Sequence, residues 1–93
     1  MSITIRIPTQ LRVLTGNNSE VVVTGATVGE ALSGLESAHP GIGERIFDET
    51  GKVRRFVNVF LSEEDVRFLN GLDTPVNDGQ VISIVPAVAG GSY

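Results

Sequence analysis

The chain has 93 residues, which leaves room for one small domain with a modest core and no deep cleft. Its net charge of −4 argues against nucleic-acid binding, because a protein that binds phosphates needs a basic surface. The absence of cysteine excludes disulfides, thiolate metal sites, a cysteine nucleophile and a side-chain persulfide.

The sequence also limits where the protein can be located in the cell and which functions it can have. No apolar run approaches the ~20 residues that cross a membrane, and residues 1–6 lack the basic start and apolar stretch of a signal peptide. We therefore expect a cytoplasmic protein that does not contact membranes. Because the chain has no room for an enclosed cleft, we do not expect a stand-alone enzyme. A single histidine without a set of partner ligands does not predict a metal site.

The first 25 residues predict a β-hairpin. Isoleucine occupies every second position of residues 3–7, which is the period of a half-buried strand, and Pro8 ends it. Residues 15–18 are rich in turn formers, and residues 20–24 predict a second strand.

A helix is predicted next. Thr27 and Glu30 have the spacing of a capping box. One apolar stripe of an amphipathic helix follows, made of Val28, Ala31, Leu32, Leu35 and Ala38. The His-Pro-Gly sequence at 39–41 ends this helix, and residues 42–47 predict a short packed turn.

The second half of the chain predicts three further strands. Residues 56–61 are the most strand-like stretch, and a charged turn at 62–65 leads into a shorter strand around 66–68. An Asn-Asp-Gly turn at 77–79 precedes a last strand at 81–85, which the next proline ends. The order β-β-α-β-β-β predicts the α+β class, with a mixed sheet and one main helix packed on one face. This is the β-grasp arrangement, in which the first and last strands lie parallel and side by side.

We expect residues 1–86 to form this domain and residues 87–93 to form a flexible tail with a di-glycine. Gly90 and Gly91 lose much conformational entropy on ordering, so disorder is the expectation for the tail. An extended chain from Pro86 to Gly91 reaches roughly 20 Å, which is enough to enter another protein's active site. Taken alone, a terminal Gly-Gly is equally consistent with a frayed end or a cloning remnant.

The strand alternation predicts a docking face at the root of the tail. If the apolar residues at 57, 59, 61, 82 and 84 face the helix, the residues between them face away. An exposed, partly apolar sheet face is typical of a partner-binding surface. We expect partners to bind there and at the root of the tail, through Asn58, Phe60, Val85, Pro86, Ala87, Val88 and Ala89. The alternative is that a loop covers Phe56, Phe60 or both.

Three segments carry a resemblance to a known family. They are residues 55–59 (Arg-Phe-Val-Asn-Val), residues 64–68 (Glu-Asp-Val-Arg-Phe) and residues 78–91, where an Asp-Gly turn and an apolar strand lead to Pro-Ala-Val and a closing Gly-Gly. They resemble the ubiquitin-like sulfur carriers, which include the small subunit of molybdopterin synthase and the thiamine-pathway carrier. The similarity runs along almost the whole chain and is greatest to the actinobacterial carriers that feed cysteine synthesis.

The resemblance implies a protein sulfur donor that binds no cofactor of its own. In this family an E1-like enzyme uses ATP to adenylate the carboxylate of the last glycine, here Gly91. Sulfur then displaces AMP and leaves a thiocarboxylate. That group donates sulfur to a synthase that makes cysteine, a cofactor or a secondary metabolite. Because the chain has no cysteine, its C-terminus is the one covalent place for the sulfur.

The sequence departs from the mature family pattern after Gly91. Ser92 and Tyr93 follow it, so the Gly91 carboxyl group is held in a peptide bond. The resemblance implies a precursor from which a JAMM-type zinc metalloprotease removes Ser92-Tyr93, and a cloning remnant is the other interpretation. Two further functions stay open. One is a ubiquitin-like modifier joined to lysines through Gly91, and the other is the small subunit of a two-subunit synthase.

Overall fold

The computed structural model of this protein describes residues 2–86. Within this part of the chain, no helix has both the length and the apolar character needed to cross a membrane. The predicted domain boundary after residue 86 stays a prediction. The predictions made for the tail also lie outside the described residues, and they concern Ala87, Val88, Ala89, Gly90, Gly91, Ser92 and Tyr93.

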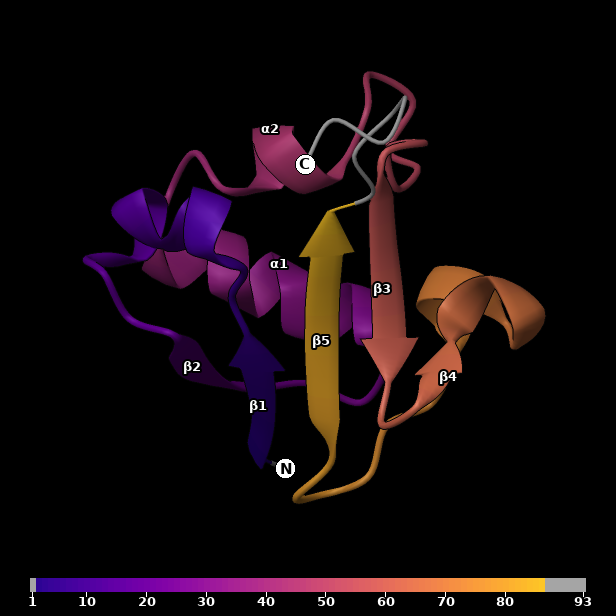
Figure 1. Ribbon diagram of the computed structural model, residues 1–93. Coiled ribbons are helices and arrows are strands. Elements are labelled where there is room, and N and C mark those ends of the chain that lie inside the picture. Colours follow the sequence, from indigo (N-terminus) through magenta and orange to yellow (C-terminus); the bar gives the residue numbers. More distant parts are fainter. Residues whose placement is uncertain (1, 87–93) are drawn as a thin grey trace.

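Five strands form one mixed sheet in the order β2-β1-β5-β3-β4 (Figure 1). Their bounds are β1 Ser2–Arg6, β2 Glu20–Thr24, β3 Val57–Leu61, β4 Glu64–Asp65 and β5 Val81–Pro86. The first and last strands, β1 and β5, lie parallel at the centre, and all other neighbours are antiparallel. The predicted mixed sheet and its parallel central pair are therefore confirmed.

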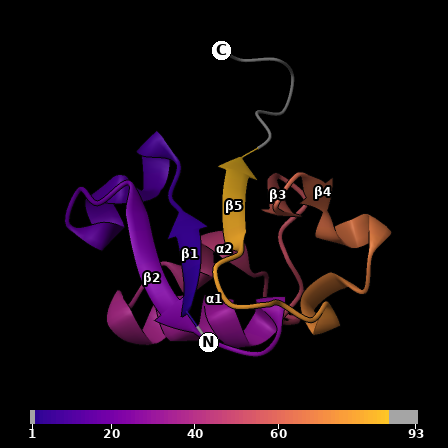
Figure 2. The same ribbon diagram turned by 90° about the horizontal axis from the view of Figure 1, so that it is seen from below.

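Two α-helices, α1 (Val28–Ala38) and α2 (Gly43–Ile46), cover one face of this sheet (Figure 2). The Thr27 hydroxyl accepts a hydrogen bond of 3.1 Å from the Glu30 N–H, as the capping box predicts. The Glu30 carboxylate accepts one of 3.0 Å from the Ala26 N–H, which lies one residue before the usual partner. The helix start is thus specified by residues adjacent in sequence.

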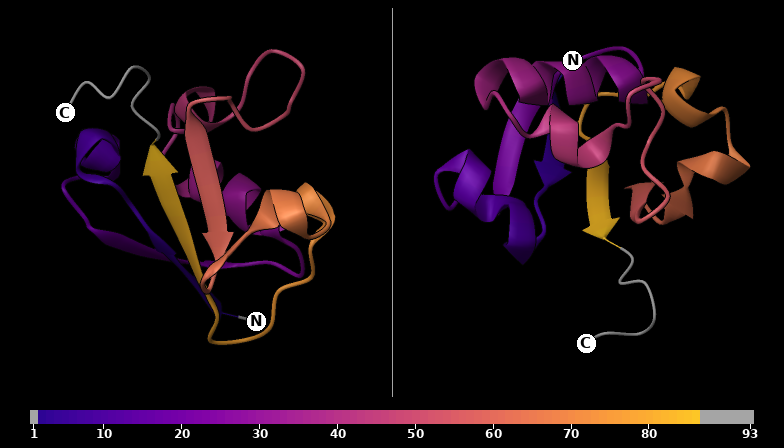
Figure 3. Two further views of the ribbon diagram at one scale, coloured as in Figure 1. Left: turned by 45° about the vertical axis from the view of Figure 1, so that its right-hand side comes forward. Right: turned by 90° about the horizontal axis from the view of Figure 1, so that it is seen from above.

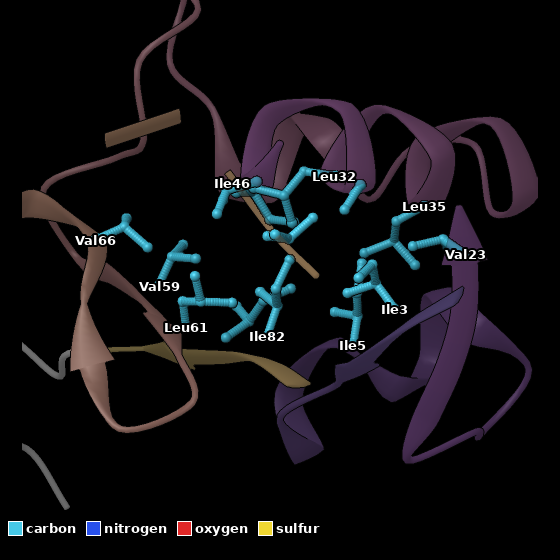
Figure 4. Packing of buried hydrophobic residues seen from close by; sticks show 14 of the residues in the cluster. Ile3, Ile5, Val23, Leu32, Leu35, Ile46, Val59, Leu61, Val66 and Ile82 are labelled. Carbon is cyan, nitrogen blue, oxygen red and sulfur yellow. The ribbon is translucent and has the colours of Figure 1, made fainter. Parts of the chain in front are cut away.

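The core lies between these helices and the sheet. Alternate residues of β1, β3 and β5 are buried against four residues of the α1 stripe, namely Val28, Ala31, Leu32 and Leu35. Figure 4 shows Leu32 and Leu35 pointing toward Ile3, Ile5 and Ile82 of the sheet. The prediction for Ala38 is wrong, because this residue is exposed. Ten residues of helix rotate it by about 80° from Val28, to the border of the stripe.

The structure also differs from the prediction between residues 62 and 68. The turn is confined to residues 62–63, β4 follows it directly, and residues 66–68 form a 3-10 helix instead of a strand. The Asp65 carboxylate accepts a hydrogen bond of 2.9 Å from the Arg67 N–H, and this cap turns the chain out of the sheet. As a result the 3-10 helices η2 (Val66–Phe68) and η3 (Gly71–Asp73) lie beyond β4 (Figure 3).

A third 3-10 helix, η1 (Thr9–Thr15), connects β1 to β2 where only a turn was predicted. Pro8 precedes it in an extended conformation, and Gly16 ends it at φ +63°, a left-handed conformation that glycine adopts without strain. The Arg12 Nε–H donates a hydrogen bond of 3.0 Å to the Ile7 carbonyl. This bond ties η1 to the end of β1.

Candidate functional site

The candidate site lies on the sheet face opposite α1. Its centre is formed by two cross-strand pairs between β3 and β5, Asn58 opposite Val85 and Phe60 opposite Ser83. We call these four residues the docking face. The intervening residues of both strands are buried in the core, so the predicted side-chain directions are confirmed. Val85 is 43% exposed, whereas Asn58 and Phe60 are half-buried. Partner binding at this face stays a prediction.

A polar network frames one side of the docking face. The Arg67 guanidinium forms an ion pair of 3.0 Å with Asp65 and donates a hydrogen bond to the Asn58 amide oxygen. The hydrogen bond from Arg67 holds the pKa of Asp65 below its usual range, and the same contact raises the pKa of Arg67. Both groups therefore stay charged at neutral pH and hold Asn58 in place. Sequence reasoning missed Arg67, since nothing local indicates its contact with a residue nine positions earlier.

The root of the tail begins at the end of β5. Pro86 is the last residue of this strand and pairs with Val57, although the predicted strand ends one residue earlier. Pro86 follows Ile82 and Ile84 at two-residue intervals along β5, so it lies on the same face of the sheet as these two buried residues. The structure therefore places Pro86 at the end of the helix-facing row, and not beside Phe60 and Val85 on the docking face.

An open groove of about 460 Å³ lies beside this end of β5. We call it the root groove, and it lies between residues 6–12 on one side and residues 83–86 on the other. Figure 3 shows η1 next to the end of β5. Ser83 and Val85 belong to both the root groove and the docking face, so the two surfaces are continuous. No pattern in the sequence predicted this groove.

The described residues carry no metal centre of their own, since no three potential ligands among histidines, aspartates and glutamates come together in residues 2–86. The site thus consists of a partly apolar face, the polar network of Asp65 and Arg67 at its side, and a groove that Arg6 and Arg12 line. Such an arrangement is suited to binding a protein surface.

Comparison with known proteins identifies the family. The model of the ThiS family matches residues 5–91 of the chain. The chain belongs to the ThiS family of ubiquitin-like sulfur carriers. It is 47% identical over 93 residues to the sulfur carrier protein CysO of Mycobacterium tuberculosis, an alignment that covers 98% of this chain and all of the relative. That relative is a carrier rather than an enzyme, which confirms the predicted non-enzymatic role.

Solved structures agree with this family. The crystal structure of the BexX/CysO complex of Amycolatopsis orientalis contains a chain that matches with a TM-score of 0.90 and 48% identity, over 96% of this chain and 99% of that one. The predicted β-grasp fold is thereby confirmed. A further relative is small archaeal modifier protein 3 of Haloferax volcanii, 39% identical over 66 residues, which are 71% of each chain.

Proposed function

We propose that the ThiS-family chain carries sulfur as a thiocarboxylate on Gly91. The observation that supports this most directly is the family match, which extends through residue 91 and so includes the di-glycine. The identity of 47% to a sulfur carrier supports cysteine synthesis as the pathway.

Three steps follow chemically. Hydrolysis of the Gly91-Ser92 peptide bond by a JAMM-type zinc protease consumes one water and frees the Gly91 carboxylate. An oxygen of this carboxylate attacks the α-phosphorus of ATP on an E1-like enzyme, and pyrophosphate leaves. A sulfide nucleophile then attacks the acyl carbon, and AMP leaves with the electron pair of the broken C–O bond. The resulting thiocarboxylate is a soft nucleophile for an activated acceptor on a synthase.

The role that we propose for the docking face is to bind the partner enzymes that act on the tail. A relative of this chain occurs in a complex with BexX, so a carrier of this family can form a defined assembly with another protein. In this chain the partly exposed Val85 lies on the strand that leads into the tail. A partner that binds this face would therefore receive the tail directly. We propose the E1-like enzyme and the sulfur-accepting synthase as such partners.

Intact mass tests the proposal. The chain ending at Gly91 is incubated with the E1-like enzyme, ATP and sulfide, and a mass increase equal to sulfur minus oxygen is expected. The full chain should gain this mass only after the protease is added, and a chain ending at Ala89 should never gain it. A full chain that gains sulfur while it retains Ser92-Tyr93 would refute the precursor step.

A second candidate is a protein modifier joined to lysines through Gly91. Its support is the 39% identity to small archaeal modifier protein 3. Both functions use the same activation, so the product distinguishes them. A thiol-specific reagent that traps the native C-terminus supports the sulfur donor, whereas isopeptide-linked ladders in the cell that depend on Gly91 support the modifier.

A further inference from the structure

We propose that the root groove binds an extended, carboxylate-bearing segment of the E1-like enzyme, and that Arg12 and Arg6 are the residues that position it. This inference rests on the proposed function, because it assumes that such an enzyme receives the tail. It adds a second, electrostatic contact to the partly apolar docking face.

The groove exists because two prolines stop the central ladder. β1 and β5 pair in parallel through Arg6 opposite Ser83, and the Thr4 N–H donates to the Gln80 carbonyl at 3.2 Å. Continuing this register places Pro8 opposite Val85, so the next two bonds of the ladder would need N–H groups from Pro8 and Pro86. Proline has no N–H to donate. The sheet therefore opens here, and the Ile84 carbonyl has no donor from β1.

The Arg12 side chain is fixed in orientation at this opening of the sheet. Its Nε–H is bound to the Ile7 carbonyl, which fixes the plane of the guanidinium. Within residues 2–86, its Nη atoms form no ion pair with a carboxylate and no hydrogen bond. Arg12 is half-buried and lines the groove. A planar, fixed guanidinium with free N–H groups is suited to a carboxylate, which it can bind with two hydrogen bonds.

Arg6 adds a second cation at the same place. It lies 3.6 Å from Glu20, and both side chains are more than half exposed. Exposed pairs of this kind contribute little to stability, so a partner carboxylate can replace Glu20 at low cost. Arg6 also lines the groove, opposite Ser83 of β5.

The charges around the docking face favour an acidic partner over a basic one. The chain carries a net charge of −4, yet the two acidic residues on this sheet face, Glu20 and Asp65, are both paired with arginines. Arg12 leaves an excess of positive charge beside the tail root. The complementary surface is therefore an apolar patch with carboxylates at its margin, on a segment extended enough to offer an N–H to the Ile84 carbonyl.

Steady-state kinetics of adenylation test this proposal on the chain ending at Gly91. We expect Arg12→Gln to raise the KM for the carrier about three- to tenfold with kcat unchanged, since one charged contact at an interface margin is lost. Arg6→Gln should raise KM in the same direction. The matched control is Arg45→Gln, which removes the same charge from an exposed site on α2 and should leave KM unchanged.

Two further measurements complete the test. The KM of the wild-type chain should rise with salt, and that of Arg12→Gln should rise less, because screening acts on the contact that the variant lacks. Melting curves of Arg12→Gln show whether loss of the hydrogen bond from Arg12 to the Ile7 carbonyl destabilises the domain. Arg6 does not take part in that bond, so Arg6→Gln tests the proposal even if Arg12→Gln is destabilised.

If both variants have the wild-type KM, or share the KM of Arg45→Gln, the inference is overturned. If no variant and not even the wild-type chain is adenylated, the proposed function itself fails.

Discussion

At the scale of single residues, Asp65 has two roles. Its carboxylate caps η2 through the Arg67 N–H at 2.9 Å and pairs with the Arg67 guanidinium at 3.0 Å. The first bond needs only an oxygen acceptor, whereas the second needs a charge. Through Arg67 the same carboxylate also orients Asn58 on the docking face. Asp65 therefore both ends β4 and, through Arg67, orients Asn58 in the candidate site.

Asp65→Asn separates the two roles. The amide oxygen can still cap η2, so the free energy of unfolding at pH 7 should fall by only about 1 kcal/mol. The pKa of Asp65 is lowered in the folded state, so its stabilisation is present above the unfolded-state pKa of about 4 and is lost as the pH falls through the folded-state pKa. Urea unfolding should therefore show a difference between wild type and variant at pH 7 that shrinks toward strong acid. Asp73→Asn, at an exposed site, is the control. A difference that stays constant down to strong acid would show that the charge is not responsible.

At the scale of elements, the contact between α1 and β2 decides which glycines are replaceable. Gly25 follows β2, and a Cβ atom there would lie 2.8 Å from the backbone nitrogen of Ala31. Gly34 lies within α1, and its nearest contact would be the Thr24 carbonyl at 3.4 Å, an ordinary van der Waals distance. The first glycine is needed for close approach, and the second is not.

Alanine at these two sites should therefore have opposite effects. Gly25→Ala forces backbone atoms apart and should lower the free energy of unfolding by about 1–3 kcal/mol. Gly34→Ala should raise it by up to about 1 kcal/mol, because alanine favours a helix more than glycine does. Thermal unfolding measures both, at about 4–8 °C per kcal/mol for a chain of this size. Equal destabilisation by both changes would contradict the close packing of Gly25 alone.

At the scale of the whole molecule, the sheet packs the core on one face, and the opposite face is the one at which we propose that partners bind. The helix-facing residues of β3 and β5 are buried, and the residues between them form the docking face. Substitutions on the docking face can therefore change activation while the core stays intact, which makes the two functions experimentally separable.

Phe60→Asp applies this separation. A carboxylate in the apolar centre should raise the KM for E1-like activation about tenfold or more, with the domain still folded by circular dichroism. Phe68→Asp is the matched control, because Phe68 is 86% exposed and lies on η2 outside the docking face. Val85→Asp provides a second test at a more exposed position of the docking face. Wild-type activation of both docking-face variants would reject this face as the partner surface.

Much of the fold was predictable because it depends on local periodicity. Isoleucine at every second position of residues 3–7 predicted a strand that faces the core on one side, and the Thr27 to Glu30 spacing predicted the helix start. The prediction failed at residues 66–68, where apolar residues suggested a strand. There the hydrogen bond from the Arg67 N–H to Asp65 overrides β propensity, and such a contact between side chain and backbone is not visible in an apolar pattern.

The sequence by itself determined most of the strands, the main helix, the two faces of the sheet, the resemblance to the family and the di-glycine of the tail, because each of these depends on the spacing of residues along the chain. Only the tertiary structure decided that Pro8 lies beside the end of β5, that Arg12 lines a groove there, and that Arg67 reaches Asn58. The physical reason is the register of the parallel central pair. It brings together prolines 78 positions apart (86 minus 8), and no local pattern specifies how two distant strands align.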